Sequence, residues 1–116
     1  MTPDELAKRR FEYETAGLDV GDLAGDPIEQ WWAWYRDAVA AAVTEPNAMT
    51  VATVDADGPD ARYVLVRSVD QRGFTFFGNH GSAKGRQAEA TGVAAITFGW
   101  LQLHRQMKWH QRQCFI

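Results

Sequence analysis

Between Met49 and Gly78, strand-like apolar runs are separated by turn signals of only a few residues. "MTVATVDADG" runs into a turn at Asp55–Gly58, "ARYVLVRSVD" follows as its partner, and "QRG" leads into "FTFFG". A parallel pair needs a crossover of a dozen or more residues, so these runs can pair only as antiparallel neighbours. The sequence therefore predicts an antiparallel meander, which "VAAITFGW" (93–100) and "RQMKWHQ" (105–111) extend to five strands.

Two helices are predicted before the strands. Three signals mark the start of the first helix: Thr2 can cap it, Pro3 suits the first helical position, and Glu5 completes a capping box. The second begins at Asp26-Pro27 and ends near "TEPNAM". Its apolar residues recur at helical spacing and predict one buried face, made of Ile28, Trp31, Trp32, Tyr35, Val39 and Val43. A third, short helix is predicted over Ser82–Ala90.

The composition is that of one globular domain. The chain has 116 residues, of which 46% are hydrophobic and 23% charged. The cluster Trp31, Trp32 and Trp34 is interpreted as core and interface rather than as a ligand cage. A net charge of −3 gives no general electrostatic case for binding nucleic acid. One cysteine, Cys114, and an N-terminus without an apolar signal core predict a soluble, cytoplasmic protein.

Basic residues recur near the predicted strand and turn ends, at Arg62, Arg67, Lys84, Arg86 and Arg105. Arginine suits phosphate because its planar fork can donate two parallel hydrogen bonds, and the helix start after "NHGS" would add free N–H groups. Solvated surface charges are nevertheless the default interpretation of such residues. Arg62 and Arg67 are five apart, so a regular strand would point them to opposite faces unless it twists or bulges between them.

The remaining sequence features give little evidence for a metal site or for a catalytic motif. His104 and His110 would share a strand face, but no close-spaced pair of metal ligands accompanies them, so no metal site is predicted. The common nucleotide-binding and hydrolase motifs are absent from the sequence. No catalytic residue is assigned.

The order and spacing of several segments resemble a known family. "EYETAGLDVGDLAGDPIEQWWAWYRDAV", "EPNAMTVATVDADG", "ARYVLVRSVDQRGFTFFGNHGSAKGRQ" and the final "HRQ" are similar to the N-terminal half of pyridoxamine 5′-phosphate oxidase, over residues 8 to 108. The resemblance implies a mainly β, α+β fold, namely an antiparallel split barrel of the FMN-binding type with N-terminal helices. It implies a single domain over 1–116, with a helical segment over 1–45 and the barrel portion over 46–116.

The resemblance also implies a function. The family oxidises pyridoxamine or pyridoxine 5′-phosphate to pyridoxal 5′-phosphate, with FMN as cofactor and oxygen as acceptor, and works as a homodimer without nucleic acid or membrane partners. The positions matching its FMN contacts are Arg62, Tyr63, Val64, Leu65, Val66, Arg67, Phe77, Gly78, Lys84 and Gln106. Arg67 also matches a substrate contact, and Arg10 and Tyr13 match an N-terminal stretch that can close over substrate.

This sequence departs from the family at several of these positions. Arg67 stands where a lysine is usual, Phe77-Gly78 replaces Tyr-Thr, and Ala83 replaces the arginine of an Arg-Lys phosphate pair. The family's C-terminal half, which supplies substrate ligands and further flavin contacts, has no counterpart in this chain. A catalytically incomplete flavin-binding module or truncated paralogue is therefore the alternative to an active oxidase. A different split-barrel flavoprotein, such as a reductase, is a third reading.

Overall fold

The structure is a computed structural model, and the residues described are 2–8, 18–77 and 92–111. In chain order, its elements are α1 (Pro3–Lys8), the short 3-10 helix η1 (Val20–Asp22), α2 (Pro27–Ala40), β1 (Ala48–Asp55), β2 (Gly58–Leu65), β3 (Ser68–Asp70), β4 (Gly73–Thr75), β5 (Ala94–Trp100), the 3-10 helix η2 (Leu101–Leu103) and β6 (Arg105–Gln111). The helix predicted over Ser82–Ala90 lies outside the described residues.

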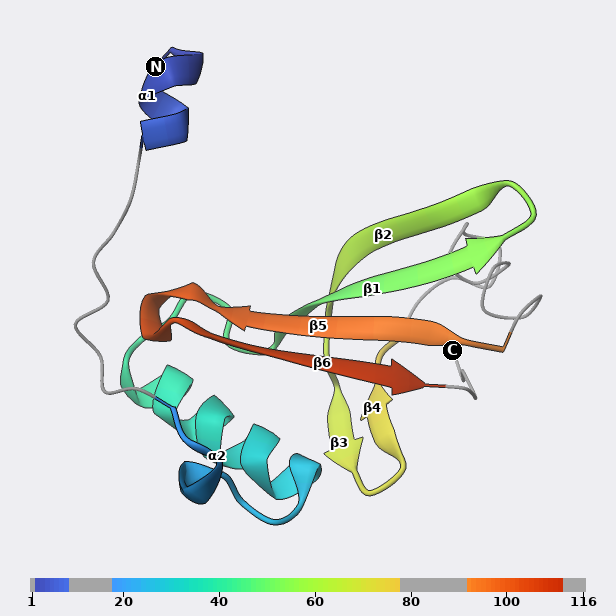
Figure 1. Ribbon diagram of the computed structural model, residues 1–116. Coiled ribbons are helices and arrows are strands. Elements are labelled where there is room, and N and C mark those ends of the chain that lie inside the picture. The colour runs from blue at the N-terminus through green and yellow to red at the C-terminus, as the bar shows by residue number, and fades with distance from the viewer. Residues whose placement is uncertain (1, 9–17, 78–91, 112–116) are drawn as a thin grey trace.

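The strands of the described residues form two sheets, and every pairing among them is antiparallel, as the short turns predicted. One sheet has the order β2-β1-β5-β6, and β3 and β4 form a separate hairpin (Figure 1). The predicted meander is therefore wrong in its order, because β1 pairs with β5 across a long stretch of chain. Burial explains the difference. Phe74 and Phe76 are buried in the core, and the Phe74 ring lies 5.7 Å from Trp31 of α2, so the hairpin packs against the helix instead of extending the sheet.

The single strand predicted over 61–70 is also interrupted. β2 ends at Leu65, and the next two residues leave its ladder. The N–H of Val66 donates to the carbonyl of Asn47 at 2.9 Å, and that of Arg67 donates to the carbonyl of Thr75 at 2.7 Å. The chain thus passes from pairing with β1 to pairing with β4 within two residues, and the alternation of faces is broken at that point.

The helix starts follow their caps. Thr2 and Glu5 form the predicted capping box, with each backbone N–H donating to the other residue's side chain at 2.8 and 3.1 Å. Asp26 caps α2, since its Oδ1 accepts a hydrogen bond from the N–H of Ile28, and Pro27 takes the first helical position. In the described part of the chain, neither helix is long and apolar enough to cross a membrane.

α2 buries a face that differs from the predicted one. Ile28, Trp31 and Val43 are buried and Tyr35 is half-buried, but Val43 lies beyond the helix, which ends at Ala40. Trp32 is 38% exposed and Val39 53% exposed, so the prediction is wrong for both, while Trp34 and Ala38 are buried in their place. Apolar residues cover much of this helix, so spacing alone allows two adjacent stripes. Contacts of Trp34 select one: its ring lies 6.2 Å from that of Trp100 and 5.3 Å from the guanidinium of Arg105.

The core lies between α2, the β3–β4 hairpin and one face of the four-stranded sheet. This face, called the core face here, carries Val51, Ile96 and Phe98, and the opposite one is called the outer face. Trp31 lies at the centre, 1% exposed, with the rings of Tyr35, Phe74, Phe98 and Trp100 within 4.9–6.4 Å. The tryptophan cluster is thus core at Trp31 and Trp34, as predicted.

Candidate functional site

Arg62 is fixed on the core face of the sheet, in the middle of β2. It lies opposite Val51 in the β1–β2 pairing. Its Nη1 donates to the carbonyl oxygen of Val51 at 3.0 Å and to the hydroxyl of Thr53 at 3.1 Å, and its Nη2 donates to Oδ2 of Asp60 at 2.8 Å. The side chain keeps 21% of its surface exposed. A largely buried cation, held by three hydrogen bonds, therefore faces solvent with only part of its guanidinium.

The other positions of the 62–67 segment do not share one face. Val64 is half-buried and packs against the core, because it is two residues from Arg62 and so lies on the same face of the strand. Tyr63 and Leu65 point to the outer face, and Tyr63 is 83% exposed. Val66 is buried beyond the end of β2. A ligand lying along this segment would thus meet backbone as well as side chains.

Arg67 and Phe77 form an exposed pair. The guanidinium carbon of Arg67 lies 5.4 Å from the centroid of the Phe77 ring, and Phe77 is 69% exposed. Because the chain leaves β2 before Arg67, the strict alternation that would have opposed Arg62 and Arg67 does not apply to them. The strand is interrupted between Arg62 and Arg67, at Val66 and Arg67.

Gln106 lies on the other side of the sheet from Arg62. It pairs with Gly99, next to Phe98 in β5, whereas Phe98 pairs with Met107. Phe98 and Met107 belong to the core face, so Gln106 belongs to the outer face, where it is exposed. Arg62 and Gln106 are therefore separated by the sheet within one chain.

Several predicted positions lie outside the described residues. These are Gly78 and Lys84 of the predicted FMN contacts, with Ala83 and Arg86 of the same turn, and Arg10 and Tyr13 of the predicted substrate contacts. The described chain resumes at Gly92 and enters β5 beside Thr53, since Ala52 pairs with Ala95. Thr53 is the residue whose hydroxyl accepts a hydrogen bond from Arg62.

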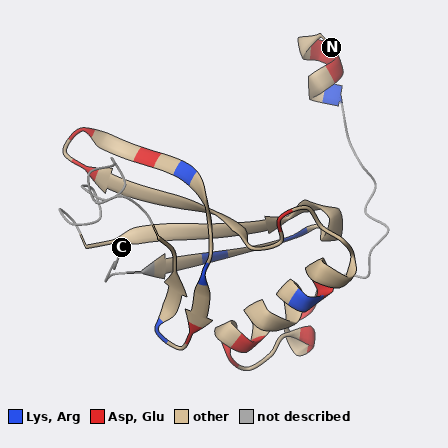
Figure 2. Cartoon of the chain, turned by 180° about the vertical axis from the view of Figure 1, so that it is seen from behind, with Lys and Arg blue, Asp and Glu red and all other residues tan. Residues whose placement is uncertain are grey.

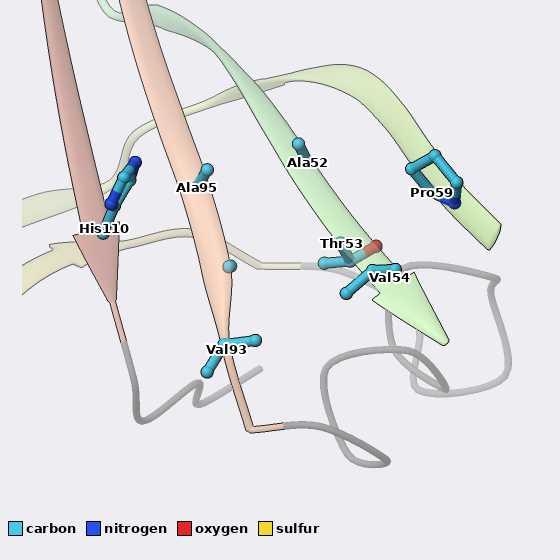
Figure 3. Close-up of a pocket in the computed structure, with 8 residues that line it drawn as sticks. Ala52, Thr53, Val54, Pro59, Val93, Ala95 and His110 are labelled. Carbon is cyan, nitrogen blue, oxygen red and sulfur yellow. The ribbon is translucent and has the colours of Figure 1, made fainter. Parts of the chain in front are cut away.

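A pocket of about 390 Å³ lies where β1 ends and β5 begins, and the sequence pattern did not predict it (Figure 3). Its lining residues are Ala52, Thr53, Val54, Pro59, Val93, Ala94, Ala95 and His110. Most of them belong to the outer face, because Val54 pairs with Pro59 and Ala95 with His110. Small residues at neighbouring strand positions create the space. Alanine and valine are common in strands of all kinds, so their presence in the sequence gave no signal of a pocket.

Other charged and metal-binding candidates are accounted for by local structure. Arg105 donates to Oδ2 of Asp37 at 2.9 Å and so joins β6 to α2 instead of standing free for a ligand. The prediction that His104 and His110 share a strand face is wrong, because β6 begins after His104, which has a left-handed φ of 53°. Within the described ranges, no group of three or more metal-binding side chains occurs.

The turn between β3 and β4 holds an exposed ion pair. Side-chain hydrogen bonds from Arg72 lower the pKa of Asp70, and the same bonds raise the pKa of Arg72. Both groups are at the surface, so the pair orders the turn and contributes little to stability. Neither pKa moves toward neutrality, so this pair is not a candidate for acid–base chemistry.

Comparison with known proteins identifies the family. The family model described as pyridoxamine 5′-phosphate oxidase matches residues 35–112. The chain belongs to this family. It is 51% identical over 104 residues to a pyridoxine/pyridoxamine 5′-phosphate oxidase of Burkholderia multivorans, covering 89% of this chain and 49% of that protein. A protein of the same name from Cupriavidus pinatubonensis is 50% identical over 105 residues, covering 90% and 50%. The chain spans about half the length of the curated relatives it matches.

Solved structures agree on the fold. PhzG from Burkholderia lata, in complex with tetrahydrophenazine-1-carboxylic acid, superimposes with a TM-score of 0.76 at 30% identity, over 84% of this chain and 48% of PhzG. A pyridoxamine 5′-phosphate oxidase-related, FMN binding protein from Nostoc punctiforme gives a TM-score of 0.59 at 20% identity, over 77% and 47%. The predicted fold class, an antiparallel split barrel of the FMN-binding type with N-terminal helices, is confirmed.

Proposed function

We propose that this chain forms part of the flavin site of an FMN-dependent oxidase. The reaction would convert pyridoxamine or pyridoxine 5′-phosphate to pyridoxal 5′-phosphate, with oxygen as acceptor. The observation that carries the proposal is the identity of about half of all aligned residues with proteins named for this activity, over 89% of the chain. The substrate class, the cofactor and the chemistry are inferred from those relatives and tested below.

The residues of the site fit a phosphorylated aromatic ligand. Arginine has five N–H donors, and the contacts described above use three of those of Arg62, so two remain for an anion. Arg67 and Phe77 offer an exposed cation and an exposed ring close together, which suits an aromatic group with polar edges. Nothing at these positions is incompatible with FMN.

Each residue then has a proposed task. Arg62, with Lys84, would bind the phosphate, while Arg67 and Phe77 would lie against the ring system and the substrate. Gln106 would donate to the edge of a flavin ring. When bound, FMN supplies the hydride acceptor that the side chains of this chain lack. The protein's part is to orient ring and substrate and to exclude water.

A second candidate is a flavin-binding module without turnover. The observation that favours it is the set of departures from the family pattern at positions that match flavin contacts. Ala83, and Phe77 followed by Gly78, would weaken the grip on phosphate and ring compared with the family pattern. PhzG, at 30% identity, is a relative seen with a phenazine carboxylic acid, so an assay with a single B6 vitamer would be too narrow.

The first test is the visible absorbance spectrum after incubation with FMN and desalting. A retained, shifted flavin spectrum is expected, and oxygen consumption with pyridoxamine 5′-phosphate then separates the oxidase from the module. Retained flavin without turnover would favour the module. A colourless, folded protein would contradict both candidates.

The positions of Arg62 and Gln106 support a homodimer. One flavin cannot contact both residues of the same chain, because they lie on opposite faces of the sheet. If both contact flavin, the outer face of one copy must meet the site of another. The outer face is suited to close packing, since Thr50 pairs with Thr97 and Ala52 with Ala95, and none of these side chains is bulky.

Sedimentation at micromolar concentration is therefore expected to show a dimer, and more so with FMN than without it. Mass action requires this increase if the ligand binds only at the joint site. Gln106→Ala should weaken FMN binding, because Gln106 is the proposed flavin contact that the outer face supplies. A strictly monomeric protein that still binds FMN would contradict the shared site.

Replacing Ala83 with arginine is expected to tighten FMN binding. A charge-assisted hydrogen bond contributes about 1.5–3 kcal/mol, which corresponds to about ten- to a hundredfold in affinity. Flavin fluorescence titration measures the change, and Ala83→Gln is the control of similar length without charge. Equal affinities of the three proteins would mean that this turn does not contact the phosphate.

A further inference from the structure

Asp60 is built into the same cluster as Arg62. The two residues are two apart on β2, so their side chains share the core face, and Asp60 pairs in register with Thr53. Oδ1 of Asp60 accepts from the N–H of Ala61 at 2.9 Å, and Oδ2 accepts from Nη2 of Arg62 at 2.8 Å. Figure 2 shows an acidic and a basic band on β2, separated by a short uncharged stretch. The carboxylate is thus held at two points, with one oxygen on the cation.

The donor pattern of Arg62 makes Asp60 a competitor for any bound anion. Nη1 already donates to Val51 and Thr53, which leaves it no further hydrogen. An anion that takes the guanidinium by two parallel bonds must then use the edge formed by Nε and Nη2. Asp60 already occupies one hydrogen of Nη2. A phosphate that approaches Arg62 therefore shares Nη2 with a carboxylate of the same sign, or displaces it.

The pose of Arg62 does not depend on Asp60. Two of its three hydrogen bonds go to the carbonyl of Val51 and to Thr53, which is 4% exposed and therefore well fixed. The Asp60 side chain is 47% exposed, and ion pairs in such surroundings contribute little to order. Removing the carboxylate should leave the guanidinium in place and take away the negative charge beside it.

We propose that Asp60 is an internal competitor for Arg62 that limits the affinity of this chain for a phosphorylated ligand. This inference rests on the proposed function, in which Arg62 meets the phosphate of FMN. Its consequence is selectivity: only a ligand that makes enough other contacts, through its ring and through the remaining cations, overcomes the competing carboxylate. Free phosphate and small phosphate esters would bind poorly.

The test compares FMN with riboflavin, which lacks the phosphate. By fluorescence titration, Asp60→Asn is expected to bind FMN about tenfold more tightly than wild type, as removal of one adjacent like charge implies. Riboflavin affinity should not change. Asp60→Glu should restore the wild-type value, and Asp57→Asn, which makes the same change in net charge within the β1–β2 turn, should leave both affinities unaltered. In an Arg62→Gln background, Asp60→Asn should have no effect.

The other outcomes overturn the inference in distinct ways. Weaker FMN binding by Asp60→Asn would make Asp60 an orienting residue, and equal changes for FMN and riboflavin would make its role structural. If wild type binds FMN and Asp60→Asn binds it equally well, the competitor is refuted while the proposed function stands. If neither protein binds FMN although circular dichroism shows both folded, the proposed function fails together with the inference.

Discussion

Replacing Trp31 with alanine is expected to lower the free energy of unfolding by about 3–5 kcal/mol, the usual cost of removing a large buried aromatic side chain. Trp31 is 1% exposed, and its ring contacts rings of α2, of the β3–β4 hairpin and of β5. Its loss would leave Phe74 and Phe98 facing a cavity. A single domain of this size has a total stability of about 5–15 kcal/mol, so the variant should be near the limit of folding.

Two matched variants make this prediction specific. Trp32→Ala removes the same side chain from the next position, where it is 38% exposed, and should cost much less. Trp31→Phe keeps a ring in the core and removes the indole N–H, which has no hydrogen-bond partner within the described residues. Trp31→Phe should therefore lower the free energy of unfolding less than Trp31→Ala does. It keeps part of the packing, and removing a buried N–H without a partner offsets part of the loss. Urea denaturation followed by circular dichroism measures all three. Equal costs for Trp31→Ala and Trp32→Ala would contradict the central position of Trp31.

Local signals in the sequence predicted local structure well. Asp26-Pro27 and the Thr2–Glu5 pair fix helix starts through contacts between residues two or three apart. The two-residue turn after Asp55 was predictable for the same reason, and Gly58 has a φ of 115° that favours glycine. Such features depend on neighbours in the chain, and the sequence contains those neighbours explicitly.

Features that depend on distant contacts were not predictable in the same way. Trp32 and Trp34 fit helical stripes equally well, and only the position of Trp100 and Arg105 decides which one is buried. The pairing of β1 with β5 accompanies the packing of Phe74 against Trp31 of α2, a contact between residues far apart in the chain. Turn lengths contain no information about it.

The candidate site shows the same division. The resemblance proposed Arg62, and the structure adds the reason for its fixed pose, since Thr53 and the Val51 carbonyl belong to the neighbouring strand. Asp60 could have been noticed, because residues two apart on a strand share a face. The placement of Gln106 on the outer face could not, because it follows from the registers of three strand pairs taken together.

Replacing Arg62 with glutamine is expected to weaken FMN binding by about ten- to a hundredfold, as the loss of charge-assisted hydrogen bonds of about 1.5–3 kcal/mol implies. Riboflavin binding should change much less, because the proposed partner of Arg62 is the phosphate. Arg62→Lys should recover only part of the affinity, since one ammonium cannot hold Val51, Thr53 and a ligand at fixed angles at the same time.

The matched control is Arg67→Gln, which removes the same charge from an exposed position. Arg67 contacts Phe77 by its guanidinium and is not buried, so it has more freedom to move and less fixed geometry to lose. Its replacement should lower the affinities for FMN and for riboflavin by similar factors, both smaller than the factor expected for FMN with Arg62→Gln. The reason is that the proposed partner of Arg67 is the ring common to both ligands. Thermal unfolding without flavin checks that Arg62→Gln remains folded. If Arg67→Gln weakened FMN alone, and Arg62→Gln weakened both ligands equally, the two arginines would have exchanged roles, and the phosphate would lie at the β3–β4 end of the site.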